Sequence, residues 1–452
     1  MWDTLDLVDN FLWSYIGFPA AFFIGIWLSF RLKFVQVRKF PHICQTFLRF
    51  LLKKDVSTSI PQSGGVSPLT AFFAGLGGCV GIGNLVAITT AVQIGGPGAV
   101  FWMWCAALVG SVLKYSEVFL GIRYRIECAK NGFRGGPMYI LAKRFAPGVA
   151  SLFCVLMCLY GVEVFQFSVI TSSVANNFNL DKLLVTLAVL GLVILAEVGG
   201  VKRIGAVCSA IIPLFILLYL SMGLYVLSEH ISELPTMFLT IIQSAFTPHA
   251  AIGSFVGAGI LATISQGLRR GYYSSDIGVG YASIIHSEAR TNDPAKQASL
   301  VIFDVFLDSF VICTMSAFLI LVTGVWKEEI SPMLLVQQAL STCFPYMHYF
   351  IPFFLFLLGY STIITFFCAG VKTAEYLHPK RGRSIYYLYA VSSLFIFSFA
   401  ETSQALILMS IVQFLLLALN LVIIFRLRKE VTADIAGTTQ NEVEHAYPTG
   451  SI

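Results

Sequence analysis

An apolar stretch near the start of the chain carries a run of glycines. Five of them lie between positions 75 and 83, in Gly75-Leu76-Gly77-Gly78-Cys79-Val80-Gly81-Ile82-Gly83-Asn84. Each glycine costs a helix about 1 kcal/mol relative to alanine, so the run predicts an unwound break. Unwound backbone offers carbonyl oxygens to a cation and amides to a carboxylate, and the helix that follows adds a positive dipole end. Close packing between helices is the alternative explanation for these glycines.

Ionisable side chains inside apolar segments form a second group of candidates. Such a residue costs roughly 2.5–3.5 kcal/mol at the centre of a membrane helix, which indicates a functional role by default. Glu163 lies in the middle of an apolar segment, three residues before Gln166, so the two share a helix face. A buried carboxyl there is a candidate proton carrier. An ion pair with Lys114, or a hydrogen bond to a neighbouring helix, is an equal alternative.

Four further charged residues occur at helical spacing in apolar segments. Lys114 and Glu117 are three apart and are expected to pair with each other. Asp304 and Asp308 are four apart, and a structural hydrogen-bonding role is at least as well supported as ion transfer. His286 lies in a polar segment without metal-ligand spacing, which favours a gate or docking loop.

The composition shows what kind of elements must hold these residues. Hydrophobic residues make up 57% of the 452 residues and charged residues only 12%, about half the charged fraction of a soluble domain. This excludes a soluble enzyme, a nucleic-acid binder and a disordered chain. The ten cysteines form no CxxC or His-paired pattern, and no catalytic set is visible. We therefore expect a helical membrane protein that is not an enzyme and has no prosthetic cofactor.

Eleven apolar segments are long enough to be membrane helices. They cover residues 11–30, 67–92, 97–122, 147–176, 181–198, 204–227, 240–265, 299–325, 346–370, 384–400 and 403–425. Positive charge collects in cytoplasmic loops. With the N-terminus outside and the C-terminus inside, every Lys and Arg lies in a cytoplasmic segment except Lys114, Lys182 and Lys327. Loop 268–297 is one of these predicted cytoplasmic segments.

The order of the segments predicts an inverted repeat. Segment 240–265 contains Gly253, Gly257 and Gly259, and it follows the glycine-rich segment by five spans. Because five is odd, the two halves cross the membrane in opposite directions, as in inverted-repeat secondary transporters. The predicted division is an extra helix and basic loop (1–56), a first repeat (57–231), a second repeat (232–429) and a polar cytoplasmic tail (430–452).

Several motifs resemble the alanine or glycine:cation symporter family over about residues 25–425. They are Gly81-Ile82-Gly83-Asn84-Leu85, then Ile94-Gly95-Gly96-Pro97-Gly98-Ala99-Val100-Phe101-Trp102-Met103-Trp104, and Gly267-Leu268-Arg269-Arg270-Gly271 through Gly280. The Gly-Gly-Pro-Gly-Ala-x-Phe-Trp-Met-Trp stretch is highly specific. The resemblance implies a LeuT-type fold with five-plus-five inverted repeats, one extra N-terminal helix, and uptake of a small amino acid with sodium or protons.

The resemblance also implies a binding site. Sodium would be held by the carbonyls of Gly77 and Val80 and the hydroxyls of Ser361 and Thr362, since sodium favours hard oxygen ligands. Without the resemblance, those hydroxyls could simply bond back to their own helix. The substrate would meet seven residues: Gly81, Ile82, Gly83, Asn84, Gln166, Phe255 and Gly257.

This chain departs from the family pattern at several positions near that site. Ile82 stands where the family usually has Thr, and Glu163 and Ser168 stand where it has Asn. Ser275 and Asp276 replace the usual Asn and Glu. These changes affect the expected substrate and coupling ion more than the expected fold.

The sequence thus predicts a multi-pass protein of the bacterial inner membrane that imports alanine or glycine with sodium as the coupling ion. A proton-coupled carrier of another small solute is the first alternative, and Glu163 is the residue that favours it. A channel or receptor built on the same scaffold is the second. The expected partners are a small amino acid, sodium or a proton, and the lipid bilayer, with no nucleic acid.

Overall fold

Helices dominate the computed structural model, which describes residues 2–52, 64–128, 132–247, 259–328, 330–400 and 403–433. Within these ranges the named strands are β1 (Ile126–Cys128) and β2 (Gly132–Arg134), which pair as a short antiparallel hairpin. The predicted all-helical architecture is confirmed. Two predicted substrate contacts, Phe255 and Gly257, lie outside the described residues.

The helices follow one another in three groups. The N-terminal group is α1 (Trp2–Phe11), the π-helical η1 (Leu12–Gly17), α2 (Phe18–Arg31), α3 (Val35–Arg38) and α4 (Phe40–Leu51). The middle group is α5 (Pro68–Cys79), α6 (Gly83–Gly95), α7 (Gly98–Arg123), α8 (Pro137–Arg144), α9 (Pro147–Tyr160), α10 (Val164–Phe178), α11 (Lys182–Glu197) and α12 (Gly200–Glu229). The last group is η2 (Ile231–Glu233), α13 (Leu234–Phe246), α14 (Ile260–Ser274), α15 (Tyr281–His286), α16 (Pro294–Val305), η4 (Phe306–Cys313), α17 (Thr314–Val322), η5 (Val325–Lys327), α18 (Pro332–Ser341), α19 (Met347–Leu377), α20 (Gly382–Phe399) and α21 (Ser403–Arg426).

Eight helical stretches in the described residues are long and apolar enough to cross a membrane. They are Thr4–Arg31, Pro68–Gly95, Gly98–Arg123, Pro147–Phe178, Gly200–Glu229, Pro294–Val322, Met347–Leu377 and Leu406–Arg426. These eight coincide with eight of the eleven predicted spans. The other three predictions fall on the 16-residue α11, on α13 and α14, and on α20.

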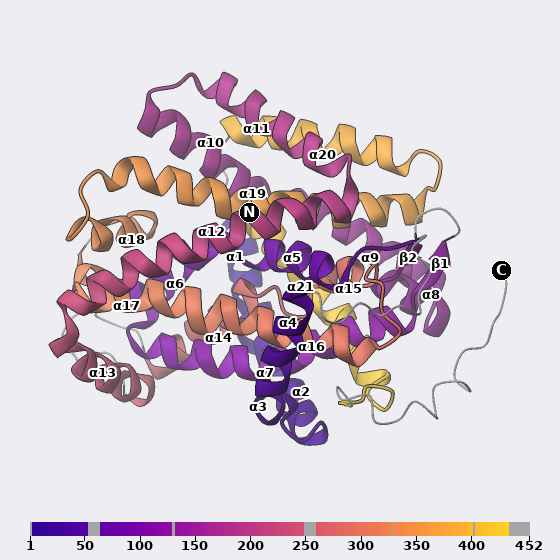
Figure 1. The fold of residues 1–452 in the computed structure, drawn as a ribbon, viewed down its shortest axis with the longest axis horizontal. Coiled ribbons are helices and arrows are strands. Elements are labelled where there is room, and N and C mark those ends of the chain that lie inside the picture. Colours follow the sequence, from indigo (N-terminus) through magenta and orange to yellow (C-terminus); the bar gives the residue numbers. More distant parts are fainter. Residues whose placement is uncertain are drawn as a thin grey trace.

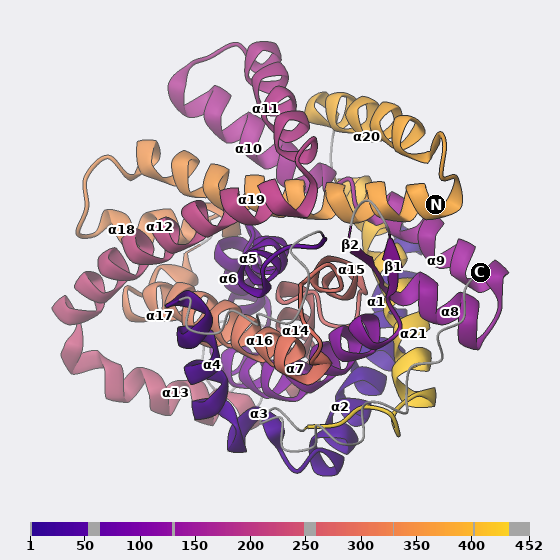
Figure 2. The ribbon, with the colours of Figure 1, turned by 45° about the vertical axis from the view of Figure 1, so that its right-hand side comes forward.

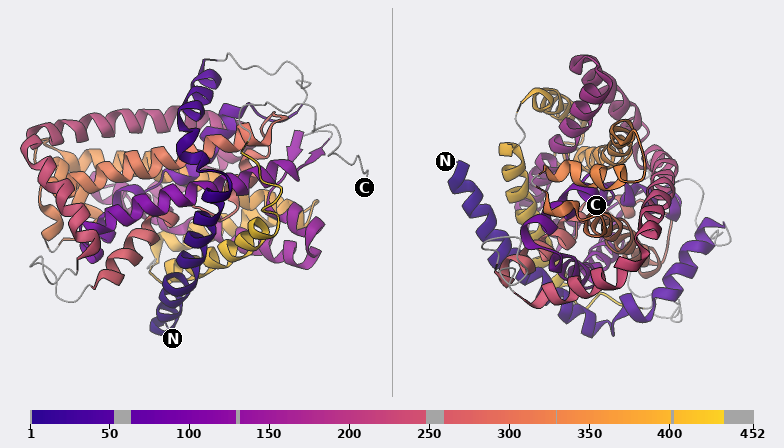
Figure 3. Two further views of the ribbon diagram at one scale, coloured as in Figure 1. Left: turned by 90° about the horizontal axis from the view of Figure 1, so that it is seen from below. Right: turned by 90° about the vertical axis from the view of Figure 1, so that its left-hand side faces the viewer.

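The long helices form a bundle with a distinct outer layer. Figures 1 and 2 show α10, α11 and α20 gathered on one side, on the outside of α19. Figure 3 shows α1 to α4 running around the outside of the bundle, across the direction of the other long helices. The N-terminal helices are therefore an addition to the bundle rather than part of its centre.

The centre of the bundle consists of helices that are buried on every face. Residues 71–79 of α5, 111–122 of α7 and 357–371 of α19 are all buried. α14 packs against α7 and α6, and α19 packs against α5, α9 and α10. A helix that is buried all round is part of a core and does not face lipid. The three buried stretches carry the candidate residues Gly77, Lys114, Glu117, Ser361 and Thr362.

Three helices are interrupted near this centre. Residues 80–82 separate α5 from α6, residues 161–163 separate α9 from α10, and residues 275–280 separate α14 from α15. The sequence predicted the first break and missed the second. It also placed an interruption of the second half within 240–265, of which residues 248–258 lie outside the described residues. A further change of direction, which the sequence did not predict, lies at 275–280, where Asp276, Gly278 and Gly280 have φ of 46°, 80° and 100°.

The prediction of a cytoplasmic loop at 268–297 is wrong for its first part. Residues 268–274 complete α14, and the side chain of Arg270 is only 2% exposed. Arg269 lies beside the N-terminal segment, 3.5 Å from Asp9 and 3.3 Å from Asn10. Both arginines lie in the segment predicted as a loop, but one is buried and the other pairs with a carboxylate of α1. Neither supports the predicted orientation, which stays a prediction.

Candidate functional site

Four oxygen atoms from α5 and α19 converge where α5 ends. The hydroxyl oxygen of Thr362 lies 3.1 Å from the carbonyl oxygen of Gly77 and 3.4 Å from that of Val80. The hydroxyl oxygen of Ser361 lies 3.5 Å from the Val80 carbonyl oxygen. Because α5 ends at this point, the Val80 carbonyl is at a helix terminus, where carbonyls have no helical partner. The structure thus brings together all four residues predicted to hold sodium.

The same two hydroxyls also lie near a carbonyl of their own helix. Ser361 and Thr362 are 2.8 Å and 3.2 Å from the carbonyl oxygen of Leu358. A hydroxyl has one hydrogen and two lone pairs. If each hydrogen points to Leu358, the lone pairs stay available toward the carbonyls of α5. The helix-internal bond and the cation site are therefore compatible, although the sequence had presented them as alternatives.

Gly81 is a glycine because the site leaves no space for a side chain. A Cβ atom at this position would lie 2.8 Å from the Thr362 hydroxyl and 2.9 Å from Oε1 of Gln166. Real Cβ atoms do not approach other atoms so closely. The backbone of the break is therefore pressed directly against α19 and α10.

Two of the amides predicted to receive the substrate carboxylate already donate to side chains. The amide of Gly81 donates to Oδ1 of Asn84 (3.1 Å), and the amide of Ile82 donates to Oε1 of Gln166 (3.2 Å). The side chain of Asn84 is buried and also donates to Asp308. Asn84 therefore stabilises the break from α6, whereas Gln166 contacts it from α10.

Glu163 lies in a break rather than inside a helix. It has φ of 51° and precedes the first residue of α10, directly after Gly161 and Val162. Its carboxylate accepts from Nε2 of Gln166 at 3.1 Å, and its side chain is 7% exposed. The predicted contact between Glu163 and Gln166 is present, although a turn and not a continuous helix creates it.

The third break is tied to the second by a tyrosine. The hydroxyl of Tyr160, the last residue of α9, donates to Oδ1 of Asp276 at 3.0 Å. The neighbouring Ser275 donates to Oδ2 of Asp308 at 2.6 Å. Asp308 lies in the π-helical η4, and π-helical turns often mark functional sites. All three breaks therefore meet at one place.

Lys114 does not have either of its predicted partners. Its ammonium group lies 2.7 Å from Asp304 and 2.9 Å from the carbonyl oxygen of Ser275, and it also contacts the sulfur of Cys79. Cys79 ends α5 and Ser275 follows α14, so one buried cation joins two of the breaks. The prediction failed because it used only the three-residue spacing along one helix. It did not consider the acceptors that other helices bring close to Lys114.

Glu117 and His286 are buried and hydrogen-bonded to other helices, which indicates a structural role. Glu117 accepts from the amide of Ser283 (3.2 Å) and from the side chain of Asn420 (2.9 Å). His286 is buried at the end of α15, with Nδ1 3.0 Å from Nε2 of Gln297, so the expected docking loop is instead packed in the interior.

Sequence reasoning missed Tyr160, Asp276 as a link between breaks, and the Lys114–Asp304 pair. Gly161 before Glu163, and the close spacing of Gly278 and Gly280, were the available signals for the two unpredicted breaks. The ion pair had no such signal, because its partners lie 190 residues apart.

Comparison with known proteins gives a consistent result. The model of the sodium:alanine symporter family matches residues 1–448. An uncharacterized transporter of Haemophilus influenzae is 33% identical over 441 residues, covering 94% of both chains. The probable sodium/glutamine symporter GlnT of Bacillus subtilis is 31% identical, covering 97% of this chain and 91% of its own. The sodium/alanine symporter AgcS of Methanococcus maripaludis is 29% identical, covering 84% and 85%.

Two solved structures show the same fold at low identity. MhsT in complex with L-phenylalanine has a TM-score of 0.54 at 17% identity, covering 81% of this chain and 90% of its own. A substrate-bound, outward-open sodium-coupled sialic acid symporter has a TM-score of 0.56 at 11% identity, covering 89% and 82%. The predicted LeuT-type fold is confirmed, and these relatives are transporters rather than enzymes.

Proposed function

Because this chain belongs to the sodium:alanine symporter family, we propose that it imports a small neutral amino acid, alanine or glycine, with sodium. The membrane would be the cytoplasmic membrane of a bacterium. The observation that carries the proposal is the convergence of four oxygens, from Gly77, Val80, Ser361 and Thr362, at the end of α5. Sodium is then a transported partner, and no prosthetic cofactor is needed.

These oxygens come from two different helices, which suggests how sodium would drive the transport cycle. The carbonyls come from the first predicted repeat and the hydroxyls from the second. A cation bound between them favours the arrangement in which α5 and α19 are close together. Sodium binding would therefore shift the population toward that arrangement, and its release would free the two helices to separate.

The amino acid would bind beside this cation. Its carboxylate suits the start of α6, where backbone amides and the helix dipole favour negative charge. Gln166 holds the Ile82 amide in this structure, so the side chain of Gln166 would have to turn away as the carboxylate arrives. Gln166 would then bind the ammonium or polar edge of the substrate, and Phe255 and Gly257 would also contact the substrate, as the sequence predicts.

Uptake into proteoliposomes tests this proposal directly. Purified protein is reconstituted, and labelled alanine and glycine are supplied with an inward sodium gradient, an inward proton gradient, or neither. We expect concentrative, saturable uptake that needs the sodium gradient. Uptake that proceeds equally without sodium, or that only equilibrates the label, would contradict the proposal.

A proton-coupled carrier is the second candidate, and the surroundings of Glu163 favour it. Its side chain is buried, and the residue that hydrogen-bonds to it among the described residues is the neutral Gln166. The cation once expected beside it, Lys114, pairs with Asp304 instead. A carboxyl in this position could bind and release a proton as the substrate comes and goes.

A further inference from the structure

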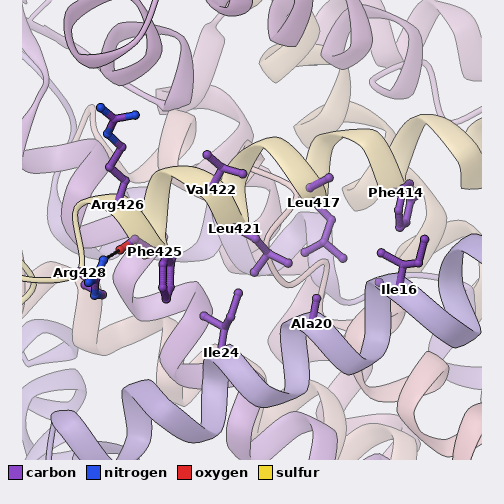
Figure 4. A pocket seen from close by; sticks show the side chains of 12 residues that line it. Ile16, Ala20, Ile24, Phe414, Leu417, Leu421, Val422, Phe425, Arg426 and Arg428 are labelled. Atoms are coloured by element: carbon purple, nitrogen blue, oxygen red, sulfur yellow. Dashed lines mark hydrogen bonds between the residues drawn. The ribbon is translucent and has the colours of Figure 1, made fainter.

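A groove lies between the N-terminal and C-terminal membrane helices. It has a volume of about 510 Å³ and runs along η1 and α2 on one side and α21 on the other. Figure 4 shows Ile16, Ala20 and Ile24 on one side facing Leu417, Leu421 and Phe425 on the other. The walls are apolar: Ile16, Ala20 and Ile24 on one side, and Phe414, Leu417 and Leu421 on the other.

Positive charge gathers at one end of this groove. Arg428 lies at that end and donates to the carbonyl oxygen of Phe425 at 2.6 Å, and no acidic residue lines the groove (Figure 4). The guanidinium group of Arg426 points away from α2 and lies 5.1 Å from the Phe145 ring. Arg31, the last residue of α2, contacts the same Trp27 ring as Arg428, at 5.8 Å and 5.6 Å. Arg31 and Arg428 are thus grouped where α2 and α21 end.

The guanidinium groups of Arg31 and Arg428 have no carboxylate partner among the described residues. The nearby Glu430 is already paired with Arg123 and Arg144. Nη1 of Arg31 is buried and has no hydrogen-bond acceptor in the described part of the chain. A buried guanidinium nitrogen without an acceptor is costly, so an external anion is the expected partner.

We propose that the groove binds an anionic phospholipid, with one acyl chain between α2 and α21 and the headgroup phosphate at Arg31 and Arg428. The groove is apolar and its lining includes the exposed side chains of Ile16, Val422 and Phe425, which suits an acyl chain. Guanidinium groups bind phosphate oxygens in a bidentate manner. Basic pockets between membrane helices at the cytoplasmic side are known to bind anionic headgroups.

The charge pattern favours a lipid over a second copy of the chain. In a twofold dimer the same surface of both copies meets. Contact through this groove would bring the arginines of both copies close together, and like charges repel. A phospholipid instead has an apolar chain that matches the apolar walls of the groove. Its negative headgroup matches the arginines at one end.

Native mass spectrometry of the purified full-length protein tests this site. The protein is titrated with phosphatidylglycerol and with phosphatidylcholine of the same acyl chains. We expect one phosphatidylglycerol to bind more tightly than phosphatidylcholine. In the double variant Arg31→Gln/Arg428→Gln, its affinity should fall by about 25-fold, roughly fivefold for each arginine, while phosphatidylcholine binding stays unchanged.

Further variants separate the acyl chain from the headgroup. Ala20→Trp and, from the opposite wall, Ala418→Phe fill the groove and should reduce the binding of both lipids. Lys380→Gln/Arg381→Gln removes two exposed positive charges between α19 and α20 and should leave phosphatidylglycerol binding intact. Size-exclusion chromatography establishes that each variant is folded.

Three results would overturn the proposal. One is equal affinity of the parent protein for the two lipids. Another is an equal loss of phosphatidylglycerol binding in the Arg31/Arg428 and Lys380/Arg381 variants, which would indicate attraction by net charge alone. The third is a concentration-dependent dimer that both groove-filling variants dissociate, which would assign the groove to a second copy.

Discussion

Thr362 and Thr365 occupy the same face of α19, one turn apart, and both reach carbonyl oxygens of α5. The Thr365 hydroxyl lies 3.0 Å from the carbonyl of Ala74, which is inside the helix, whereas Thr362 faces the carbonyls of Gly77 and Val80 near its end. A carbonyl inside a helix is already engaged by an amide four residues on. At the scale of single residues, Thr362 is therefore placed to share a cation and Thr365 is not.

This difference gives a matched pair of variants. Thr362→Ala removes a neutral oxygen ligand, a loss of about 1 kcal/mol. We therefore expect roughly a fivefold rise in the sodium concentration that gives half-maximal uptake. Thr365→Ala should change protein abundance by a similar amount but not the sodium dependence. Equal changes in sodium dependence for both variants would show that the Thr362 hydroxyl only stabilises the helix.

Glu163→Gln tests the proton carrier. The amide keeps the size and the hydrogen bonding of the carboxyl but cannot titrate. If Glu163 carries a coupled proton, proton-driven accumulation of alanine should disappear, while exchange of labelled for unlabelled alanine should continue. The same change at Glu117, whose carboxylate is bonded to Ser283 and Asn420, serves as the control. An unchanged pH profile in Glu163→Gln leaves sodium as the driver.

At the scale of elements, the interrupted helices act together because side chains join their breaks. Gln166 joins the α5–α6 break to Glu163 in the α9–α10 break, and Tyr160 joins α9 to Asp276 in the third break. Each break by itself leaves backbone groups unpaired at membrane depth, which is tolerated only inside protein or a cavity. Their convergence explains why all three can persist.

Adding one methyl group at Gly81 in the α5–α6 break should strongly reduce transport. Gly81→Ala places a Cβ atom 2.8 Å from the Thr362 hydroxyl and 2.9 Å from Gln166, so α10 or α19 must move. We expect sodium-driven uptake to fall at least tenfold in protein that still inserts in the membrane, about 1.4 kcal/mol or more. Gly191→Ala on α11, with nothing within 4 Å, should leave uptake unchanged. Normal uptake by Gly81→Ala would mean that this contact does not persist during transport.

At the scale of the whole molecule, most of the architecture could be predicted from the sequence. Long apolar segments and the glycine run at 75–83 identify the spans and the first break, because both are properties of continuous sequence. The second break needs only Gly161 and one residue with positive φ, Glu163, which hydropathy does not register. The partners of Lys114 depend on helix packing, which no local spacing contains.

The predicted orientation can be tested on the intact protein. A reporter that is active only in the cytoplasm should be active when fused after Arg134 or Arg383, because positive loops stay inside. The same reporter should be silent when fused near Lys182 or Lys327. Reversed activity at any two of these sites would contradict the orientation with the N-terminus outside.

The Lys114–Asp304 pair limits how this sequence can change over time. Removing one partner of a buried ion pair costs about 3–5 kcal/mol, because the other charge is left alone in the interior. Replacing both partners by neutral residues of similar size can be nearly neutral. A lineage that loses this pair must therefore change both positions together or pass through a poorly folded intermediate, although the two codons lie far apart in the gene. The same non-additivity applies to a mutational library. Single substitutions at either position would be destabilising and would wrongly suggest that no other pair of residues is tolerated there.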